Sequence, residues 1–375
     1  MTYARMTMKR FSTCTMLLLT LVLADATAQP IPFDSARWDI SGQTAHPMNY
    51  MGQPALLLQG GMAVLQDASF TNGVIEFDIA FAESRTFTGV QWRRQDDANA
   101  EEFYFRPHLS GMPDANQYAP TYHGLSGWQL YHGPAYSAPV RYRFNTWMHV
   151  KLVVSGNRGE VYLDSDEPIL AFDLKRDAAP GSVGIYAANL APVFFANFSY
   201  REEARPALKG TPIPPEPAPA GTVTAWSVSS PFPEAALDGK TRLTDADKRG
   251  LTWQSLPAEP AGITNLAQIT DPGNGNNTVF ARLTIQAERD QVKKLRFGYS
   301  DRVKVYVNDR LVYSGTTAYA TRDYRYLGTI GLFDAVYLPL KRGTNEVWMA
   351  VSEDFGGWGI LAQIEDQAGI TLARQ

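Results

Sequence analysis

The stretch Gly73-Val-Ile-Glu-Phe-Asp-Ile-Ala-Phe81 carries the clearest structural signal in the chain. Its large apolar residues, Ile75, Phe77, Ile79 and Phe81, recur at every second position. Because successive side chains of a strand point to opposite faces, this spacing predicts a strand with one face in a core.

Similar short runs recur along the whole sequence, separated by turn-forming residues, and no segment shows a clear helical period. The predicted strands cover residues 55–58, 62–65, 89–94, 102–108, 147–154, 160–164, 169–172, 182–186, 193–198, 223–228, 278–285, 291–297, 304–313, 336–340, 346–351 and 359–364. Residues 304–313 are expected to form a hairpin that turns at Asn308-Asp309, and a long loop is expected after residue 108. Many short strands at regular spacing are typical of antiparallel β-sandwiches, so we predict an all-β protein.

Length and composition agree with that fold class. The chain has 375 residues, enough for two domains, and only 19% of them are charged. The formal net charge is −4. Nucleic acids and anionic membranes are bound by basic surfaces, so neither is expected as the main partner.

The first 28 residues have the pattern of a signal peptide. Lys9 and Arg10 precede an apolar run, Met16–Leu23, and Ala26-Thr-Ala28 is a small-residue cleavage site. We expect cleavage near Ala28 and a secreted or periplasmic bacterial protein. The run is short for a permanent membrane span, although an uncleaved anchor is the alternative.

The chain contains a single cysteine, Cys14, and it lies inside the predicted signal peptide. The mature protein would therefore have no thiol. This excludes disulfides, cysteine nucleophiles and cysteine metal ligands.

A proline-rich segment at residues 204–221 divides the chain. Such a segment is extended and semi-rigid and does not enter the interior of a sheet. Its prolines are Pro206, Pro212, Pro214, Pro215, Pro217 and Pro219. We therefore predict two β-sandwich domains, at residues 29–203 and 222–375, joined by this linker.

Residues 33–203 resemble the concanavalin A-like lectin/glucanase superfamily, in particular its laminin G-like branch. They also resemble the bacterial 3-keto-disaccharide hydrolase-type domains. The resemblance is carried by the 73–81 strand and by Gly89–Arg94, Glu102–Arg106, Phe144–Lys151 and Val161–Asp164. It implies a jelly-roll sandwich, and it leaves the activity open because the superfamily contains lectins, hydrolases, lyases and adhesion modules.

The second domain resembles the galactose-binding-like jelly roll that accompanies secreted carbohydrate enzymes. The residues that carry this resemblance are Phe297–Asn308 and Glu353–Gly359. The resemblance implies that they are mostly framework. Trp358, between two glycines, is expected to pack against the end of the sandwich.

The strongest candidate site lies on the predicted strand that contains Phe103 and Phe105. On the opposite face of that predicted strand we expect Glu102, Tyr104, Arg106 and His108. We predict that further residues converge with this row in a cleft on the concave side of the first sandwich: Arg93, His123, Trp128, Tyr131, Trp147 and His149. Aromatic faces beside charged and imidazole groups suit an oligo- or polysaccharide.

Catalytic residues are not identified by any motif. Glu102 and His108 are the candidates, since catalysis in such a cleft needs an acid and a base. The triplet Glu76, Asp78 and Glu83 resembles the acidic residues of laminarinase-type glucanases. Glu83 comes too late for that spacing, so a solvated outer strand face is the preferred interpretation.

No metal or cofactor is predicted. His-x-His, His-Glu-x-x-His, Gly-x-Ser-x-Gly and phosphate-binding glycine loops do not occur. Residues 271–277 contain Asp271, Asn274, Asn276 and Asn277, which could supply oxygen ligands to a structural calcium ion. A turn is the favoured interpretation.

Three functions remain open at this point. The first is an exported protein that binds a glycan on the concave face of its first sandwich. The second is a glycoside hydrolase of the 3-keto-disaccharide hydrolase or glucanase type that uses carboxylates in the same cleft. The third is a structural or adhesion module.

Overall fold

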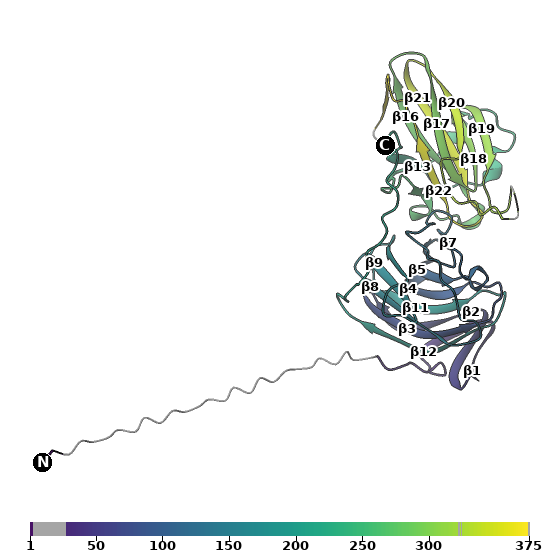
Figure 1. Cartoon of the computed structure of the whole chain (residues 1–375). Helices are drawn as coiled ribbons and strands as arrows, with labels where there is room; N and C mark the ends of the chain where they lie inside the picture. The colour runs from purple at the N-terminus through teal and green to yellow at the C-terminus, as the bar shows by residue number, and fades with distance from the viewer. Residues whose placement is uncertain (3–27, 322, 324, 374–375) are drawn as a thin grey trace.

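The computed structural model describes residues 1–2, 28–321, 323 and 325–373. The predicted signal peptide lies almost entirely outside the described residues, as does Cys14, so cleavage and export stay predictions. The described chain is an all-β protein built from antiparallel strands, as predicted (Figure 1). Within the described ranges, no helix is long and apolar enough to cross a membrane.

The N-terminal half forms one antiparallel sheet of 12 strands, which we call the N-terminal sandwich. Its strands are β1 Trp38–Tyr50, β2 Gln53–Phe70, β3 Gly73–Phe81, β4 Thr88–Asp96, β5 Asn99–Phe105, β6 Asn116–Tyr122, β7 Leu125–Ser126, β8 Met148–Ser155, β9 Arg158–Leu163, β10 Leu170–Asp173, β11 Gly181–Ala187 and β12 Val193–Glu202. Strand order is β10-β9-β8-β3-β12-β2-β11-β4-β5-β6-β7, with β1 paired to β2.

Strand β2 joins the two layers of this sandwich. Residues 55–58 of β2 pair with β12, while residues 61–70 pair with β11. The sheet therefore folds over at β2, and apolar side chains from both layers form a single buried core. Phe77 and Ile79 of the 73–81 strand are fully buried in it, as the alternation predicted.

The long β1 strand was not predicted, and the two runs at 55–58 and 62–65 belong to one strand rather than two. Gly60 and Gly61 do not end β2. Gly61 instead allows a close approach to β1, because a Cβ on its partner Gly42 would lie 2.4 Å from the Cα of Gly61. Glycine here permits backbone contact between paired strands, and in the sequence that signal is indistinguishable from a turn.

The segment after Phe105 also differs from the prediction. Strand β5 ends at Phe105, and His108 lies in a 3-10 turn, η1 Pro107–Leu109, because Pro107 cannot continue the ladder. The expected long loop contains β6 and β7. Pro120 disfavoured a strand in the sequence, because proline cannot donate to a ladder. The strand forms because β6 is almost at the edge of the sheet: its outer neighbour β7 pairs only with residues 121 and 122.

The C-terminal half forms a second antiparallel structure, the C-terminal sandwich, with sheets of seven and four strands. Its strands are β13 Ala225–Ser229, β14 Trp253–Pro257, β15 Thr264–Asn265, β16 Thr278–Ala287, β17 Gln291–Ser300, β18 Arg302–Val307, β19 Arg310–Thr316, β20 Asp334–Leu340, β21 Gly343–Ser352, β22 Gly359–Gln363 and β23 Ile370–Leu372. The short helices are α1 Asp245–Lys248, η2 Glu234–Leu237, η3 Leu266–Gln268 and η4 Gly273–Gly275.

The hairpin predicted at 304–313 is confirmed as β18 and β19. Its turn residues, Asn308 and Asp309, have φ of 46° and 71°. Asparagine and aspartate tolerate this left-handed region better than most residues, which explains why the pair is a reliable turn signal.

No strand occurs between Glu202 and Ala225, the segment that contains the proline-rich linker. The linker nevertheless follows the N-terminal sandwich closely. The backbone N–H groups of Lys209 and Gly210 donate to the Glu160 carboxylate of β9, at 3.0 and 2.6 Å. The exact domain limits stay a prediction.

The two sandwiches meet at the segment that follows β7, in the middle of Figure 1. Gln129 of the N-terminal sandwich is fully buried there. Its backbone N–H donates to the Gly356 carbonyl at 2.9 Å, and its carbonyl accepts from Ile330 at 3.0 Å. Trp358 is fully buried in the C-terminal core, where its indole N–H donates to the Val351 carbonyl, so the predicted packing role is confirmed.

Candidate functional site

A set of polar side chains lies on the side of the layer formed by β11, β4, β5 and β6 that faces away from the N-terminal core. The register pairs Gln91 with Glu102, and Tyr104 with Gln117, so these four residues share a face. Phe103 and Phe105 point the other way, into the core, as predicted. We call Gln91, Glu102, Tyr104, Arg106, Gln117 and Tyr186 the polar face.

Glu102 is a buried carboxyl group within the polar face. The Gln91 side-chain amide donates to its Oε2 at 2.8 Å. Burial raises the pKa of Glu102 above its usual value, and hydrogen bonds with Gln91 and Tyr186 oppose that shift. The protonated form is therefore easier to populate here than on an open surface.

Arg106 connects the remaining members of the polar face. Its guanidinium donates to the Tyr104 hydroxyl at 2.7 Å, to the Asp114 carbonyl at 2.9 Å and to the side-chain oxygen of Gln117. The Gln117 amide donates in turn to the carbonyl of Trp128 at 2.8 Å. Glu102, Tyr104 and Arg106 thus share one face as predicted, but they form a buried, mutually bonded set.

His108 lies beside this set rather than in the predicted strand row. Its ring packs against Phe87, with centroids 5.3 Å apart, and its buried Nδ1 has no hydrogen-bond partner. Burial, with the charges of Arg85 and Arg106, lowers the pKa of His108. A neutral imidazole therefore prevails at pH 7.

Trp128 is half-buried at the junction between the two sandwiches, and two aromatic rings of the C-terminal sandwich contact it. The Trp128 ring lies 6.3 Å from the Tyr319 ring and 5.8 Å from the Phe355 ring, and those two are 5.9 Å apart. Tyr319 is 39% exposed and Phe355 57%. We call these three residues the aromatic cluster.

Sequence reasoning missed Gln117, Tyr186, Tyr319 and Phe355 as possible site residues. Gln117 was assigned to a loop because β6 was not recognised. Tyr186 was on a predicted strand, and pairing of β11 with β4 is what brings it beside Glu102. No local pattern marks Tyr319 as a neighbour of Trp128.

Three of the predicted site residues are held in place away from the polar face by other parts of the fold. A register shift in β4 turns Arg93 away from the polar face, and its guanidinium donates to the carbonyls of Thr71 and Gly156 at 2.8 and 2.6 Å. His123 occupies the tight turn between β6 and β7, with φ of 51°. Tyr131 is buried at the domain junction, with its hydroxyl bonded to Glu259.

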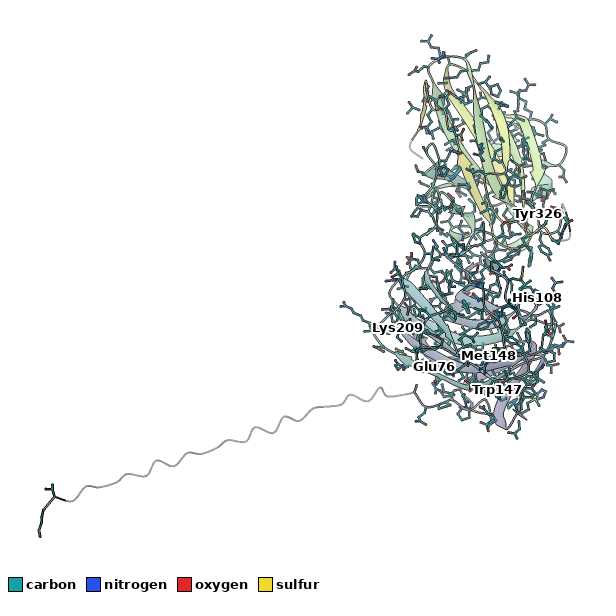
Figure 2. The ribbon with its side chains drawn as sticks, viewed as in Figure 1. Glu76, His108, Trp147, Met148, Lys209 and Tyr326 are labelled. Carbon is teal, nitrogen blue, oxygen red and sulfur yellow. The ribbon has the colours of Figure 1, made fainter. Side chains whose placement is uncertain are left out.

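Trp147 and His149 do not converge with the polar face. His149 is on β8, and five strands (β3, β12, β2, β11 and β4) separate β8 from β5 in the sheet. Because the sheet folds over at β2, the outward side of β8 is the opposite surface of the sandwich. Figure 2 shows His108 near the C-terminal sandwich and Trp147 towards the far end of the N-terminal one.

His149 instead contacts the acidic residues of β3. Its Nδ1 lies 2.8 Å from Asp78 and its Nε2 lies 3.6 Å from Glu76. Hydrogen bonds with these two carboxylates raise the pKa of His149 to about 9. Glu83 is exposed and lies beyond the end of β3. The three acids therefore form no glucanase-like set, and the outer-face interpretation agrees with the structure.

Residues 271–277 form the predicted turn. Asp271 accepts a hydrogen bond from the Gly273 N–H at 2.8 Å, and Asn274 has φ of 60°. In the described ranges, no three or more His, Cys, Asp or Glu side chains are grouped so that they could hold a metal ion.

Comparisons with known proteins return only distant structural similarities. No protein-family model matches the chain, and no curated protein matches it significantly. A carbohydrate-binding module of family 66 from Bacillus subtilis is 17% identical, with a TM-score of 0.35 over 44% of this chain and 96% of that one.

A Bacillus licheniformis beta-glucanase is 12% identical, with a TM-score of 0.36 over 47% of this chain and 97% of that one. A galectin-like protein of unknown function from Bacillus subtilis is 10% identical, with a TM-score of 0.37 over 48% of this chain and 97% of that one. Similarities at this level do not assign the chain to a family or give it a function.

Proposed function

We propose that this chain is an exported carbohydrate-binding protein whose polar face recognises an oligo- or polysaccharide. The C-terminal sandwich is proposed to be a galactose-binding-like accessory domain. The observation that carries the proposal is the hydrogen-bonded set around Arg106. It holds donors and acceptors in fixed positions beside the ring of Phe87, and it is bonded to the backbone carbonyl of Trp128.

This arrangement suits a sugar for a physical reason. A sugar presents hydroxyl groups around its edge and C–H groups on its faces, so recognition combines directional hydrogen bonds with aromatic contact. Gln91 and Tyr186 are half-buried and remain reachable, while the buried members hold them in place. A rigid set of this kind loses little conformational entropy on binding.

Calorimetric titration with laminari-, cello-, malto- and galacto-oligosaccharides of two to six units tests the proposal. We expect binding by the unmodified chain, and at least about tenfold weaker binding by Gln91→Ala combined with Tyr186→Phe. Gln286→Ala, a change at an exposed glutamine of β16, is the matched control. Absence of heat with every sugar, or equal affinity in the double variant, contradicts the proposal.

Glycoside hydrolysis is a second candidate, favoured by the raised pKa of Glu102. A general acid must hold its proton near the working pH, and burial shifts the pKa of Glu102 in that direction. Release of reducing sugar by the unmodified chain that is lost in Glu102→Gln would support this candidate. Binding without turnover leaves the first proposal in place and removes this one.

Export is part of the same proposal. The predicted cleavage near Ala28 would leave Gln29 as the first residue of the mature chain. N-terminal sequencing of protein recovered from the periplasm or medium tests this directly. Retention in the cytoplasm with an intact N-terminus contradicts it.

A further inference from the structure

We infer that the C-terminal sandwich supplies half of the glycan site: Tyr319 and Phe355, with Trp128, form an aromatic surface that contacts a sugar ring next to the polar face. This inference rests on the proposed function and goes beyond it, because it makes binding a property of both sandwiches together.

The aromatic cluster is connected to the polar face by a direct bond. Gln117 accepts from Tyr104 and Arg106 and donates to the Trp128 carbonyl. The backbone position of Trp128 is therefore set by the same side chain that orders the polar face.

The neighbour of Trp128, Gln129, fixes the cluster from the other side. Its side-chain amide donates to the Leu327 carbonyl at 2.7 Å and accepts from the Ser300 hydroxyl at 2.8 Å. Gly356 lies against it so closely that a Cβ there would be 2.5 Å from the Gln129 Cδ. Trp128 and Phe355 are thus held near each other because the residues that follow them, Gln129 and Gly356, are bonded to each other.

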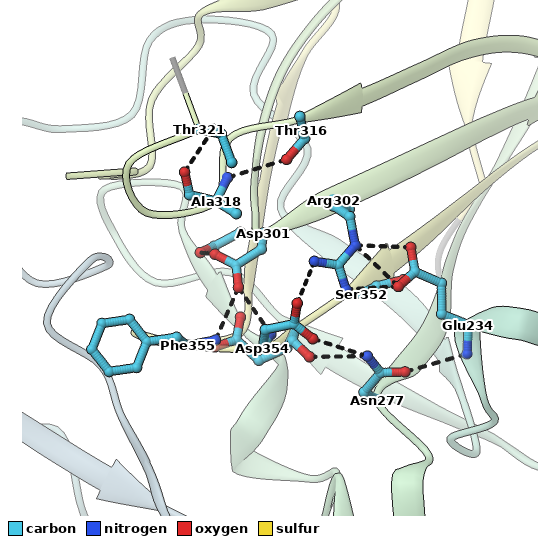
Figure 3. Close-up of polar contacts among 12 residues, drawn as sticks. Glu234, Asn277, Asp301, Arg302, Thr316, Ala318, Thr321, Ser352, Asp354 and Phe355 are labelled. Atoms are coloured by element: carbon cyan, nitrogen blue, oxygen red, sulfur yellow. Dashed lines mark hydrogen bonds and ion pairs between the residues drawn. The ribbon is translucent and has the colours of Figure 1, made fainter. Parts of the chain in front are cut away.

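Phe355 is held although its ring is exposed. The buried carboxylate of Asp301 accepts from the backbone N–H groups of Asp354 and Phe355, each at 2.9 Å (Figure 3). Arg302 pairs with both Asp354 and Glu234. In Figure 3 the Phe355 ring points away from this polar network. An exposed ring on so firmly bonded a backbone is pre-organised for contact with a partner.

A sugar fits this surface better than a protein helix or a polyanion. The rings are tilted by 61–78° to one another and are few, so they make a small faceted surface rather than an extended apolar stripe. The negative formal charge of the chain disfavours polyanions. The hydrogen bond from Gln117 to the Trp128 carbonyl ties the aromatic cluster to the hydrogen-bonding polar face, which favours a polyhydroxylated ring.

The test compares Phe355→Leu and Tyr319→Leu with the unmodified full chain by titration with laminari-, cello- and maltohexaose. Leucine keeps an apolar side chain at the junction and removes the aromatic face. We expect about tenfold weaker binding in each variant, which corresponds to ~1.4 kcal/mol, with an unchanged melting temperature. Phe355→Tyr should retain affinity.

Matched controls are Phe333→Leu and Tyr337→Leu. These aromatics of the same sandwich are 65% and 66% exposed, and neither is part of the aromatic cluster. They should bind like the unmodified chain. If Phe355→Leu binds normally, the inference fails while the proposed function stands. If the unmodified chain binds none of the hexasaccharides but a protein or a second copy binds through Phe355, both fail.

Discussion

The Ser300 hydroxyl of the C-terminal sandwich donates a hydrogen bond of 2.8 Å to the side-chain oxygen of Gln129 in the N-terminal sandwich, across 171 residues of sequence. Gln129 is fully buried, and all its polar groups are paired with Ser300, Leu327, Ile330 or Gly356. Through its side chain and its backbone, Gln129 therefore bonds the segment that carries Trp128 to the C-terminal sandwich.

Replacing Gly356 should loosen this junction. Gly356→Ala places a Cβ against Gln129 at a residue with φ of 105°, so we expect a loss of about 2–4 kcal/mol in the free energy of unfolding. Gly343→Ala is the control, because Gly343 has a similar φ of 95° with no atom within 4 Å of its Cβ position. Equal losses in urea titrations of the two variants would show that backbone strain alone is responsible.

Removing the Gln117 side-chain oxygen, which accepts from Tyr104 and Arg106, should lower the free energy of unfolding. Gln117→Leu leaves the Tyr104 hydroxyl and one guanidinium nitrogen of Arg106 without their shared acceptor, in a buried place. An unsatisfied buried charged donor costs about 2–4 kcal/mol, so we expect a clearly lower unfolding free energy. Denaturant unfolding measures it, with Gln286→Leu as the exposed control. A loss below about 0.5 kcal/mol would contradict this account.

Glu101 gives the protein a pH dependence of its own. Burial is the main cause that raises its pKa from 4.5 to about 7. The folded state then binds more protons than the unfolded state between pH 4.5 and 7, so stability falls as pH rises through that window, by at most about 3 kcal/mol. Urea titrations of Glu101→Gln across pH 4–8 should lack this fall. An identical slope in the variant would show that another group is responsible.

His149 makes stability fall with rising pH in a higher window than Glu101 does. Its pKa rises from 6.5 to about 9 because it hydrogen-bonds to Asp78 and Glu76. A raised pKa means that the stabilisation is fully present below pH 6.5 and is lost as pH rises through 9. The melting temperature of the unmodified chain should exceed that of His149→Gln near pH 6, and the two should coincide by about pH 10. The effect is small, because the imidazole is half exposed to solvent. A gap that widens with pH contradicts the assignment.

The sequence by itself was sufficient for the all-β class, most strand positions and the inward-facing residues. Period-two alternation at Ile75, Phe77 and Ile79 is a local signal, and burial of one strand face follows from it without knowledge of the partners. The grouping of Glu102, Tyr104 and Arg106 could also be predicted, because they are near neighbours along one stretch of chain. His108 could not, since Pro107 ends the strand before it.

Only the tertiary structure decided which distant residues meet. Trp147 and His149 were expected beside Arg106, but the fold at β2 places them on the opposite surface. Trp128 meets Tyr319 and Phe355 because Gln129 fits against Gly356. Local alternation states which way a side chain points relative to its own strand. What that side chain faces is determined by strand order and by the docking of the two sandwiches. Both depend on contacts between residues that are far apart in the sequence.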